Sequence, residues 1–420
     1  MSKNLNERIC IIGAGPAGLA AAMYLEQKGY DNYTILEKND YVGGKCYSPY
    51  YKGKRYEMGA LMGAKCYHTV QEITEYCNKE ADGPVLDREF RNAVTGEVED
   101  AFPKEETPAI LGDLKKLAKL LATKYDGFQV VGHLGTHPDM METFSDFCDM
   151  NGVSNVKKLW LNPLTSFGYG YMNWVPAAYV LKYLDAQELQ LFLKKELWTW
   201  KDGTQSIWER LSDKLKNQPR LGTKISKVVR ADGKVYVYTE FGKEEYDKII
   251  VTAPLDQMEK YFDVTEEEQT HFAKIVHEDY KVFACTVKNY PKISAYVQEN
   301  MVESKAGHAM VYYHRWANEP EQIITAYALG NEAQGIGIAE TKKMIEDDMK
   351  KFGFEIDQIV LHKSWYYFPH INTFDYKSGW YDDVESWQGK NQTYYAGEVM
   401  SFGDMEKTTA YSKELVNRFF

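Results

Sequence analysis

The sequence has no run of 18 or more apolar residues, so we expect no membrane-spanning helix and leave open only transient contact with a membrane surface. Basic residues are outnumbered: 50 Lys and Arg stand against 61 Asp and Glu, a net charge of −11. Because phosphate binding needs a basic surface, we expect no nucleic-acid partner. The six Cys form no C-x-x-C pair, and no apolar signal core precedes the first predicted strand. Reduced thiols in a cytoplasmic protein are therefore expected.

Several catalytic signatures are also missing from the sequence. It has no Ser-His-Asp order, no H-E-x-x-H and no Cys/His spacing typical of a metal site, so we expect no bound metal. Gly335-Ile336-Gly337 has the G-x-G form but follows no clear strand. Aromatic residues, by contrast, make up 14% of the chain, with 32 Tyr and 9 Trp. Such a content suits a thick core or an aromatic-lined cavity.

The N-terminal region contains a dinucleotide-binding pattern. The apolar run Ile9–Ile12 predicts a buried strand, and Gly13-Ala14-Gly15-Pro16-Ala17-Gly18 follows at once. A helix is predicted over 19–28, and a second strand, Tyr33–Leu36, ends in Glu37. The order of strand, glycine turn, helix, strand and acid is that of a Rossmann-type βαβ unit.

Each residue type in this pattern has a physical role. Gly13 allows the tight turn, Gly15 lets the backbone approach a pyrophosphate, and Gly18 lets the helix pack closely on the strand. Glu37 accepts hydrogen bonds from ribose hydroxyls, and its charge disfavours a 2′-phosphate. The helix N-terminus offers N–H groups to the phosphates. The predicted cofactor-binding residues here are Gly13, Gly15, Ala17, Gly18, Glu37 and Lys38.

Later glycines indicate which dinucleotide binds. Val42-Gly43-Gly44-Lys45 resembles the Gly-Gly doublet of the flavin amine oxidase and desaturase superfamily, and Arg55–Ala60 resembles that superfamily's next stretch, which approaches the flavin ring. Near the C-terminus, a strand ending in Gly397-Glu398 and a helix over about 407–419 resemble its final return to the cofactor. The resemblance implies FAD, held also by Gly43, Gly44, Lys45, Met58, Gly59, Ala60, Gly397 and Glu398. No Cys follows Cys285, so we expect the FAD to be non-covalent.

The same resemblance predicts an α/β fold of three interleaved parts. A Rossmann-type FAD-binding domain is expected from residues 1–80, 196–265 and 385–420, and a mixed-sheet substrate domain from 81–104 and 266–384. Residues 105–195 should form a helical cap, since leucines recur there every three or four residues, at Leu111, Leu114, Leu117 and Leu121. An Asp232-Gly233 hairpin is predicted between strands 227–229 and 234–238, and one strand over 246–254. Further strands are predicted over 280–287, 308–314, 322–329 and 360–367, with a helix over about 340–352.

More specific stretches point to one family. Tyr56–Ala60, Val175–Asp185, Trp365–His370 and Tyr395–Gly403 resemble the bacterial FAD-dependent polyunsaturated fatty acid isomerases, which turn linoleic acid into a conjugated linoleic acid (CLA). The resemblance runs along the whole chain and implies a redox-neutral reaction, in which flavin N5 takes a hydride and returns it two carbons along. The resemblance assigns no catalytic side chain.

Substrate binding would then combine a long apolar wall with one cation. Burying an eighteen-carbon chain gains on the order of 10 kcal/mol, whereas one charge-assisted hydrogen bond adds only about 1.5–3 kcal/mol. Arg88 and Phe192 match a cation and a gate residue at the tunnel mouth of the isomerase family; alternatively Arg88 pairs with Asp87 or Glu89, and Phe192 is a core residue. Phe167, Tyr169, Tyr171 and Trp200 are either core residues or faces for a passing cation. His314 and His370 are expected as hydrogen-bonded core residues.

Two other function classes remain open from the sequence. An amine oxidase or a fatty-acid or carotenoid desaturase would share the flavin domain, and Lys281 would then be the candidate lysine beside flavin N5. A non-catalytic flavin-dependent lipid carrier is the third hypothesis. Peroxide formation from amines would identify the oxidase, and fatty-acid binding without turnover would identify the carrier. The choice of double bond, the chain length and the oligomeric state are left open.

Overall fold

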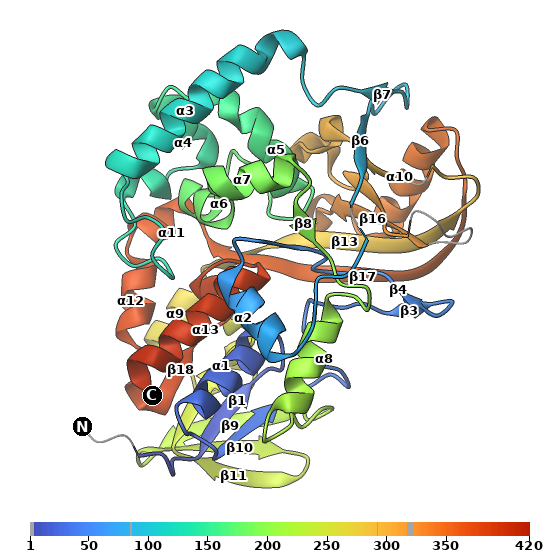
Figure 1. Ribbon diagram of the computed structural model, residues 1–420. Helices are drawn as coiled ribbons and strands as arrows, with labels where there is room; N and C mark the ends of the chain where they lie inside the picture. The colour runs from blue at the N-terminus through green and yellow to red at the C-terminus, as the bar shows by residue number, and fades with distance from the viewer. Residues whose placement is uncertain (1–3, 85, 292, 317–322) are drawn as a thin grey trace.

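The computed structural model describes residues 4–84, 86–291, 293–316 and 323–420 (Figure 1). Gln322, where a strand was predicted to begin, lies outside these ranges. In Figure 1 two small sheets, one parallel and one antiparallel, lie in the lower part, a long twisted sheet crosses the middle and a group of helices lies above it. This arrangement agrees with the α/β class expected from the sequence, and we propose the predicted boundaries of the three parts for it.

The lower parallel sheet has the strand order β18-β12-β1-β2. The bounds are β1 Ile9–Ile12, β2 Tyr33–Leu36, β12 Lys248–Val251 and β18 Thr393–Tyr395, all paired in parallel. Three segments that are far apart in the chain therefore form one sheet. Helices α1 (Pro16–Gln27) and α13 (Met405–Phe419) pack against each other beside it.

The boundaries of these elements differ slightly from the predicted ones. Helix α1 begins one turn earlier than predicted, because Pro16 at its start needs no hydrogen-bond donor and its φ already suits a helix. The Asp232-Gly233 turn is present with both residues in the left-handed region, between β9 (Ile225–Ala231) and β10 (Lys234–Thr239). The predicted single strand over 246–254 is wrong. Tyr246 ends a third strand, β11 (Gly242–Tyr246), and β12 begins at Lys248.

The central sheet has seven strands in the order β17-β13-β16-β15-β14-β6-β7. All four strands predicted in this region exist, although β13 and β17 are longer than expected, and the predicted helix is α10 (Ile338–Lys351). Strands β6, β7 and β14 were missed because they are short. The bounds are β6 Arg88–Arg91, β7 Val98–Glu99, β13 Ile275–Val287, β14 Ser294–Tyr296, β15 Val311–His314, β16 Ile323–Leu329 and β17 Ile356–Ile371.

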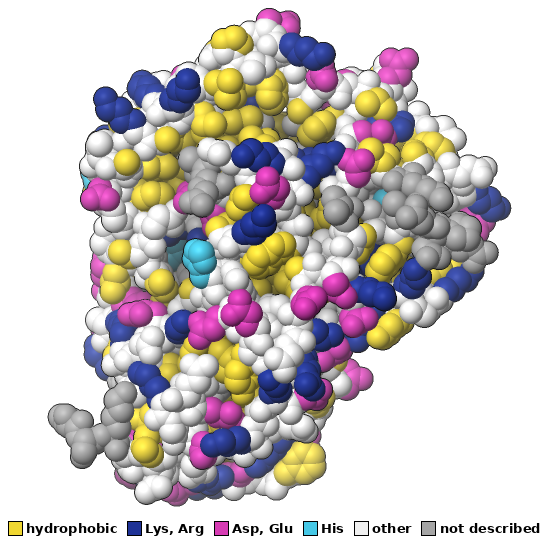
Figure 2. Space-filling model, in the orientation of Figure 1, with side chains coloured by type: hydrophobic (Ala, Val, Ile, Leu, Met, Phe, Trp, Pro, Cys, Tyr) yellow, Lys and Arg dark blue, Asp and Glu magenta, His cyan; other side chains and the backbone are white. Residues whose placement is uncertain are grey.

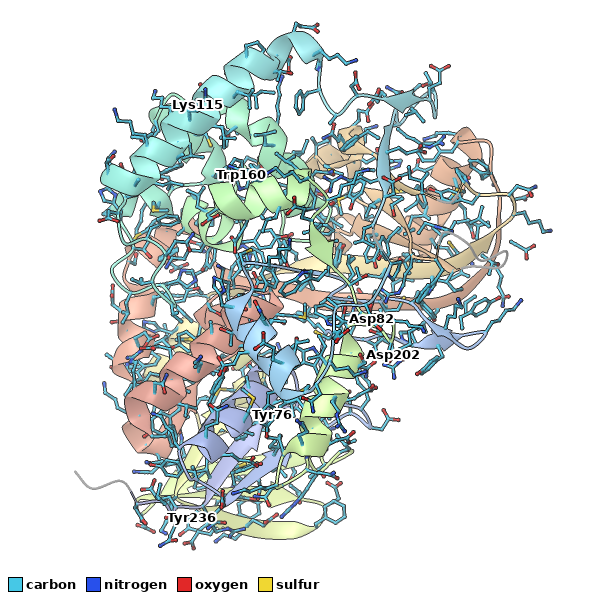
Figure 3. The ribbon with its side chains drawn as sticks, in the orientation of Figure 1. Tyr76, Asp82, Lys115, Trp160, Asp202 and Tyr236 are labelled. Atoms are coloured by element: carbon cyan, nitrogen blue, oxygen red, sulfur yellow. The ribbon has the colours of Figure 1, made fainter. Side chains whose placement is uncertain are left out.

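The proposed cap, residues 105–195, consists of helices packed over this sheet. Trp160 lies in its interior, and Lys115 lies on its outer helix α3 (Figure 3). The predicted leucine stripe is wrong at one position: Leu111 is half exposed, and Ile110 is buried instead. The cap helices are α3 Thr107–Thr123, α4 Phe144–Met150, α5 Lys157–Thr165, α6 Ala177–Tyr183 and α7 Ala186–Leu193.

Short elements join these parts. They are β3 Tyr50–Tyr51, β4 Lys54–Arg55, β5 Gly63–Ala64, β8 Leu197–Trp198, α2 His68–Tyr76, α8 Gln205–Lys214, α9 Glu266–Phe272, α11 Thr373–Lys377 and α12 Trp380–Ser386. In the described part of the chain, no helix is both long and apolar enough to cross a membrane. Figure 2 shows hydrophobic side chains gathered over the upper part of one face, where Figure 1 places the cap, and charges of both signs lower down.

Candidate active site

The glycine turn between β1 and α1 contains two glycines that the fold requires and one that packing does not explain. Gly13 has a φ of +103°, and a Cβ on Gly18 would lie 2.0 Å from the Gly13 carbonyl oxygen, so the fold itself requires both. Gly18 thus packs on the turn rather than on the strand. Gly15 has no left-handed φ, and a Cβ there would meet no protein atom closer than 3.8 Å. Packing does not explain Gly15, whereas a ligand lying against the turn does.

Glu37 is held at the end of β2 with its carboxylate next to this turn. One oxygen accepts a hydrogen bond from the Ala14 N–H at 2.9 Å, and the other accepts from the backbone and side chain of Asn39 at 2.8 and 2.7 Å. These bonds fix the carboxylate, whose oxygens keep acceptor capacity for ribose hydroxyls. Ala17 is buried in α1, and Lys38 is exposed beside Glu37.

Two distant segments lie near the same turn. The Gly43 N–H donates to the Ala14 carbonyl at 2.9 Å, and a Cβ on Gly44 would lie 3.2 Å from the Gly15 Cα. After β18, a Cβ on Gly397 would lie 2.9 Å from the carbonyl oxygen of Thr252. Lys45 and Glu398 join the two segments by an ion pair of 2.5 Å. The structure thus brings together residues separated by more than 350 positions.

The residues present fit FAD. Besides the open surface at Gly15, the first turn of α1 carries no acidic residue and its N-cap makes no side-chain hydrogen bond. Its N–H groups and positive dipole end suit a pyrophosphate. Met58 is buried, and Gly59 and Ala60 continue from it to the wall of a pocket.

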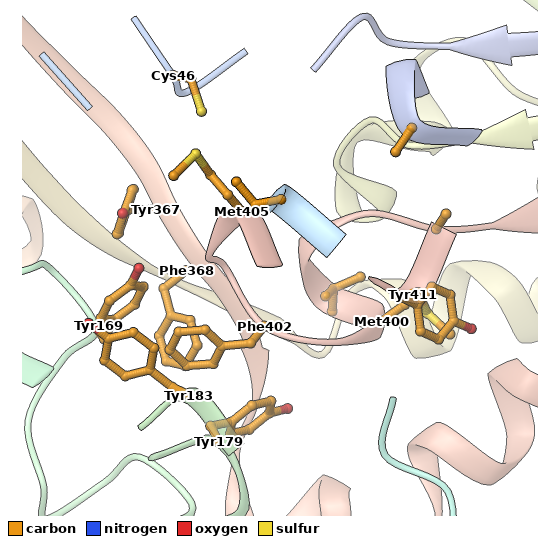
Figure 4. Packing of buried hydrophobic residues seen from close by; sticks show 14 of the residues in the cluster. Cys46, Tyr169, Tyr179, Tyr183, Tyr367, Phe368, Met400, Phe402, Met405 and Tyr411 are labelled. Atoms are coloured by element: carbon orange, nitrogen blue, oxygen red, sulfur yellow. The ribbon is translucent and has the colours of Figure 1, made fainter. Parts of the chain in front are cut away.

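This pocket lies between the flavin-domain segments, the central sheet and the cap. The empty space inside it, its open mouth included, is about 490 Å³. Its wall is mostly aromatic and aliphatic, and Figure 4 shows Tyr169 and Tyr183 packed beside the rings of Phe368 and Phe402. The lining residues are Gly59, Ala60, Leu61, Met62, Tyr67, Phe167, Tyr169, Tyr183, Tyr280, Tyr367, Gly403, Asp404 and Met405.

The tyrosines of the wall are neutral. Burial holds the pKa values of Tyr169, Tyr183 and Tyr280 well above that of an ordinary phenol, so their hydroxyls keep their protons at neutral pH. Tyr169 lies 4.7 Å from Tyr183 and 5.5 Å from Tyr367, measured between ring centroids. The pocket therefore presents ring faces and little charge, which suits an apolar substrate and any positive charge that develops on it.

Arg88 and Phe192 are next to each other and lead to this pocket. The guanidinium lies 4.2 Å from the centre of the Phe192 ring and donates to the Phe192 carbonyl at 2.7 Å. Phe192 makes an edge contact of 5.9 Å with Phe167, which lines the pocket. Phe192 is itself buried, as a core residue would be.

The alternative pairing of Arg88 is not found. Asp87 pairs with Lys195 and Glu89 pairs with Arg91, and no carboxylate of the described chain lies within ion-pair distance of the Arg88 guanidinium. Burial lowers the pKa of Arg88, but a guanidinium stays charged. Arg88 is thus a half-buried cation without an acidic partner among the described residues.

Lys281 does not reach the pocket. It follows Tyr280 on β13, so its side chain points to the opposite face of the sheet. Its ammonium donates to Asp279 at 2.7 Å and lies 3.5 Å from Glu332. The lysine expected for an amine oxidase is therefore engaged elsewhere.

The sequence identified only part of the pocket wall. Of the four aromatic residues considered, Phe167 and Tyr169 line the pocket, whereas Tyr171 and Trp200 do not. His314 and His370 are buried, and His370 is hydrogen-bonded to the Phe368 carbonyl at 2.8 Å. The residues that were missed are Leu61, Met62, Tyr67, Tyr183, Tyr280, Tyr367, Gly403, Asp404 and Met405. The sequence held one signal for this part of the wall. Gly168 and Gly170 flank Tyr169, and two glycines so close together indicate a segment that packs tightly against another part of the chain.

The family model of flavin-containing amine oxidoreductases matches residues 16–403, from the start of α1 to the residue before Asp404. The chain belongs to this family. Its cofactor is FAD.

Within this family, individual relatives indicate a likeness to fatty acid isomerases. A CLA-producing fatty acid isomerase from P. acnes is 48% identical over 100% of both chains, with a TM-score of 0.98. A polyenoic fatty acid isomerase of Ptilota filicina is 33% identical over 72 residues, 17% of this chain and 14% of its own. Putrescine oxidase is 12% identical over 98% of both chains with a TM-score of 0.71, a likeness of fold alone. The resemblance to the isomerases that the sequence indicated is confirmed.

Proposed function

We propose that this protein is an FAD-dependent isomerase that converts a polyunsaturated fatty acid, such as linoleic acid, to a conjugated linoleic acid. The observation that carries the proposal is the 48% identity, over both full lengths, to a CLA-producing isomerase. The pocket supports it independently, because its wall is aromatic, aliphatic and poor in charge. A methylene-interrupted diene fits such a wall.

FAD, when bound, supplies a group that accepts a hydride and gives it back. The proposed binding residues surround one turn: Gly15, Ala17 and the α1 N-terminus take the pyrophosphate, and Glu37 and Lys38 lie at the ribose. Gly43, Gly44 and the pair Lys45–Glu398 flank the same turn, with Gly397 behind them. Gly13 and Gly18 shape the turn itself. Met58, Gly59 and Ala60 carry the chain from the cofactor to the substrate pocket.

The chain's own residues bind and orient the substrate. The apolar wall supplies most of the affinity, on the order of 10 kcal/mol for a fully buried eighteen-carbon chain before entropic losses. Arg88, which has no acidic partner in the described chain, holds the carboxylate, and Phe192 closes the mouth beside it. The rings of Phe167 and Tyr169 face the reacting carbons, exclude water and stabilise positive charge on the substrate.

The test is to incubate the purified yellow protein with linoleic acid in the absence of NAD(P)H and to follow conjugated-diene absorbance. Mass spectrometry then identifies the isomer. We expect product without net oxidation and without stoichiometric peroxide. Binding of linoleic acid without turnover, at full FAD occupancy, would instead indicate a lipid carrier. Peroxide formation from amines would indicate an oxidase.

Two further features complete the proposal. The six cysteines of the chain form no disulfide, which supports a reducing, cytoplasmic location.

The cap exposes several large apolar side chains, which support brief contact with a lipid surface from which fatty acids are taken. They are Leu111, Val130, Val131, Leu134, Met150, Trp174 and Leu193.

A further inference from the structure

Asp404 is an unusual residue in the pocket wall. It is 9% exposed, and of the lining residues in the described chain it alone carries an acid. One carboxyl oxygen caps α13 by accepting the Lys407 N–H at 2.6 Å. The other oxygen is buried and has no hydrogen-bond partner. Because leaving a buried polar atom unpaired is costly, this oxygen calls for a role beyond the helix cap.

The position of Asp404 suits a role in the reaction. Gly59 and Ala60, the segment expected beside the flavin ring, share the pocket with it, as do Tyr169 and Tyr183. Charges inside such a low-dielectric wall interact strongly. A hydride leaves and returns to the substrate in the proposed reaction, so the substrate between these steps is a cation spread over five carbons.

We propose that Asp404 is a catalytic residue whose carboxylate stabilises the positive charge on the substrate between loss and return of the hydride. This inference rests on the proposed function. Asp404 exchanges no atom and no electron: the hydride leaves one carbon, returns two carbons along, and the carboxylate stays ionised throughout. Its contribution is electrostatic and preorganised, since the helix cap fixes one oxygen and the other lies buried and unpaired in a residue of the pocket wall.

The surroundings of Asp404 determine its protonation. Burial raises its pKa to about 8, and the charges of Glu188 and Glu406 act in the same direction, whereas Lys407 lowers it. Lys407 is itself paired with Glu188 at 3.4 Å. The other ionisable groups facing it are the neutral phenols Tyr67, Tyr169, Tyr183 and Tyr367. Ionised Asp404 should therefore form as the pH rises through about 8, and turnover should rise with it.

The first experiment compares Asp404→Asn with the wild type as holoenzymes. Asn is as good a helix cap as Asp, so the fold and the flavin spectrum should persist. We expect wild-type kcat to rise between pH 6 and 9, and the variant to be at least 30-fold slower at pH 8.5 with no such rise. Asp348→Asn, which removes a buried acid on α10 outside the pocket, should keep the wild-type profile. Asp404→Ser, also a helix-capping residue, replaces the Asn variant if that variant loses FAD.

The second experiment measures binding without turnover. N-octylnonan-1-amine carries an ammonium in the middle of an eighteen-atom chain and so mimics the cationic substrate. Titration followed by the flavin absorbance should show at least tenfold tighter binding to the wild type at pH 9 than at pH 6.5, and no such change for Asp404→Asn. Equal pH dependence in both proteins, or equal kcat in both, overturns the proposal. If the wild type forms no conjugated diene at any pH, the proposed function fails, and the amine titration still decides the role of Asp404.

Discussion

At the scale of single residues, Arg88 is a cation without an acidic partner in the described chain, and we propose that it binds the substrate carboxylate. Arg88→Gln should raise the KM for linoleic acid with little change in kcat, since the guanidinium orients the far end of the substrate. The loss of a charge-assisted hydrogen bond, about 1.5–3 kcal/mol, corresponds to roughly a 10- to 150-fold weaker affinity. Arg91→Gln is the matched control, because Arg91 lies on the same strand but is paired with Glu89. Steady-state kinetics measure both variants, and an equal effect in the two would contradict the assignment of Arg88.

Substitutions of Gly15 and Gly18 should have different effects, one on FAD affinity and the other on protein stability. Gly15→Ala adds a Cβ that meets no protein atom closer than 3.8 Å, so the unfolding temperature of the FAD-free protein should be unchanged while the FAD affinity falls at least tenfold. Gly18→Ala places a Cβ 2.0 Å from a carbonyl oxygen and should destabilise the protein itself. Thermal unfolding and FAD titration separate the two effects. A Gly15→Ala protein with normal FAD affinity would refute the ligand-based explanation of this glycine.

At the scale of elements, the segment between α5 and α6 shows how the pocket wall is built. Gly168 and Gly170 both have positive φ and press on β13, Gly168 against the Tyr280 ring and Gly170 against Glu278. Tyr169 lies between them and lines the pocket. The position of this ring therefore depends on two residues that lack a side chain.

Substituting Gly170 tests this packing. Gly170→Ala places a Cβ 2.5 Å from a Glu278 oxygen, in addition to the backbone strain of positive φ, and should lower both the unfolding temperature and the isomerisation rate. Gly135→Ala has a similar φ of +67° and an open environment, so it should show the strain alone, about 1–2 kcal/mol, with normal turnover. Equal rates in the two variants would mean that Tyr169 is placed by other contacts.

At this scale the sequence predicted most elements but not all their partners. Apolar runs and the Asp232-Gly233 turn are local signals, and the strands and hairpin they predict exist. The short strands β6 and β14 carry no such signal and exist only because a neighbouring strand pairs with them. The exposure of Leu111 likewise depends on which face of α3 meets the rest of the cap, and helical periodicity alone does not define that face.

At the scale of the whole molecule, the proposed FAD site is built from distant parts of the chain. The proposed binding residues come from the N-terminal unit, the segment at Gly43 and the return at Gly397, so bound FAD should stabilise the fold by mass action. Removing FAD should lower the unfolding temperature, and adding it back should restore the original value. A calorimetric scan with increasing FAD measures the effect. Denaturation followed by ultrafiltration should release all the flavin, and flavin that stays with the chain would contradict non-covalent binding.

The sequence by itself determined the class of fold and the cofactor, because the glycine turn, Glu37 and Gly43-Gly44 are close together in the chain. Each of these residue types suits a local requirement, either for a backbone conformation or for contact with the cofactor. It also indicated the isomerase family, which the full-length likeness confirms. The tertiary structure alone decided the pocket. Tyr67, Tyr280, Tyr367 and Asp404 come from four distant segments, and no local pattern marks a side chain that becomes part of a site only when the sheet, cap and C-terminal helix close around it.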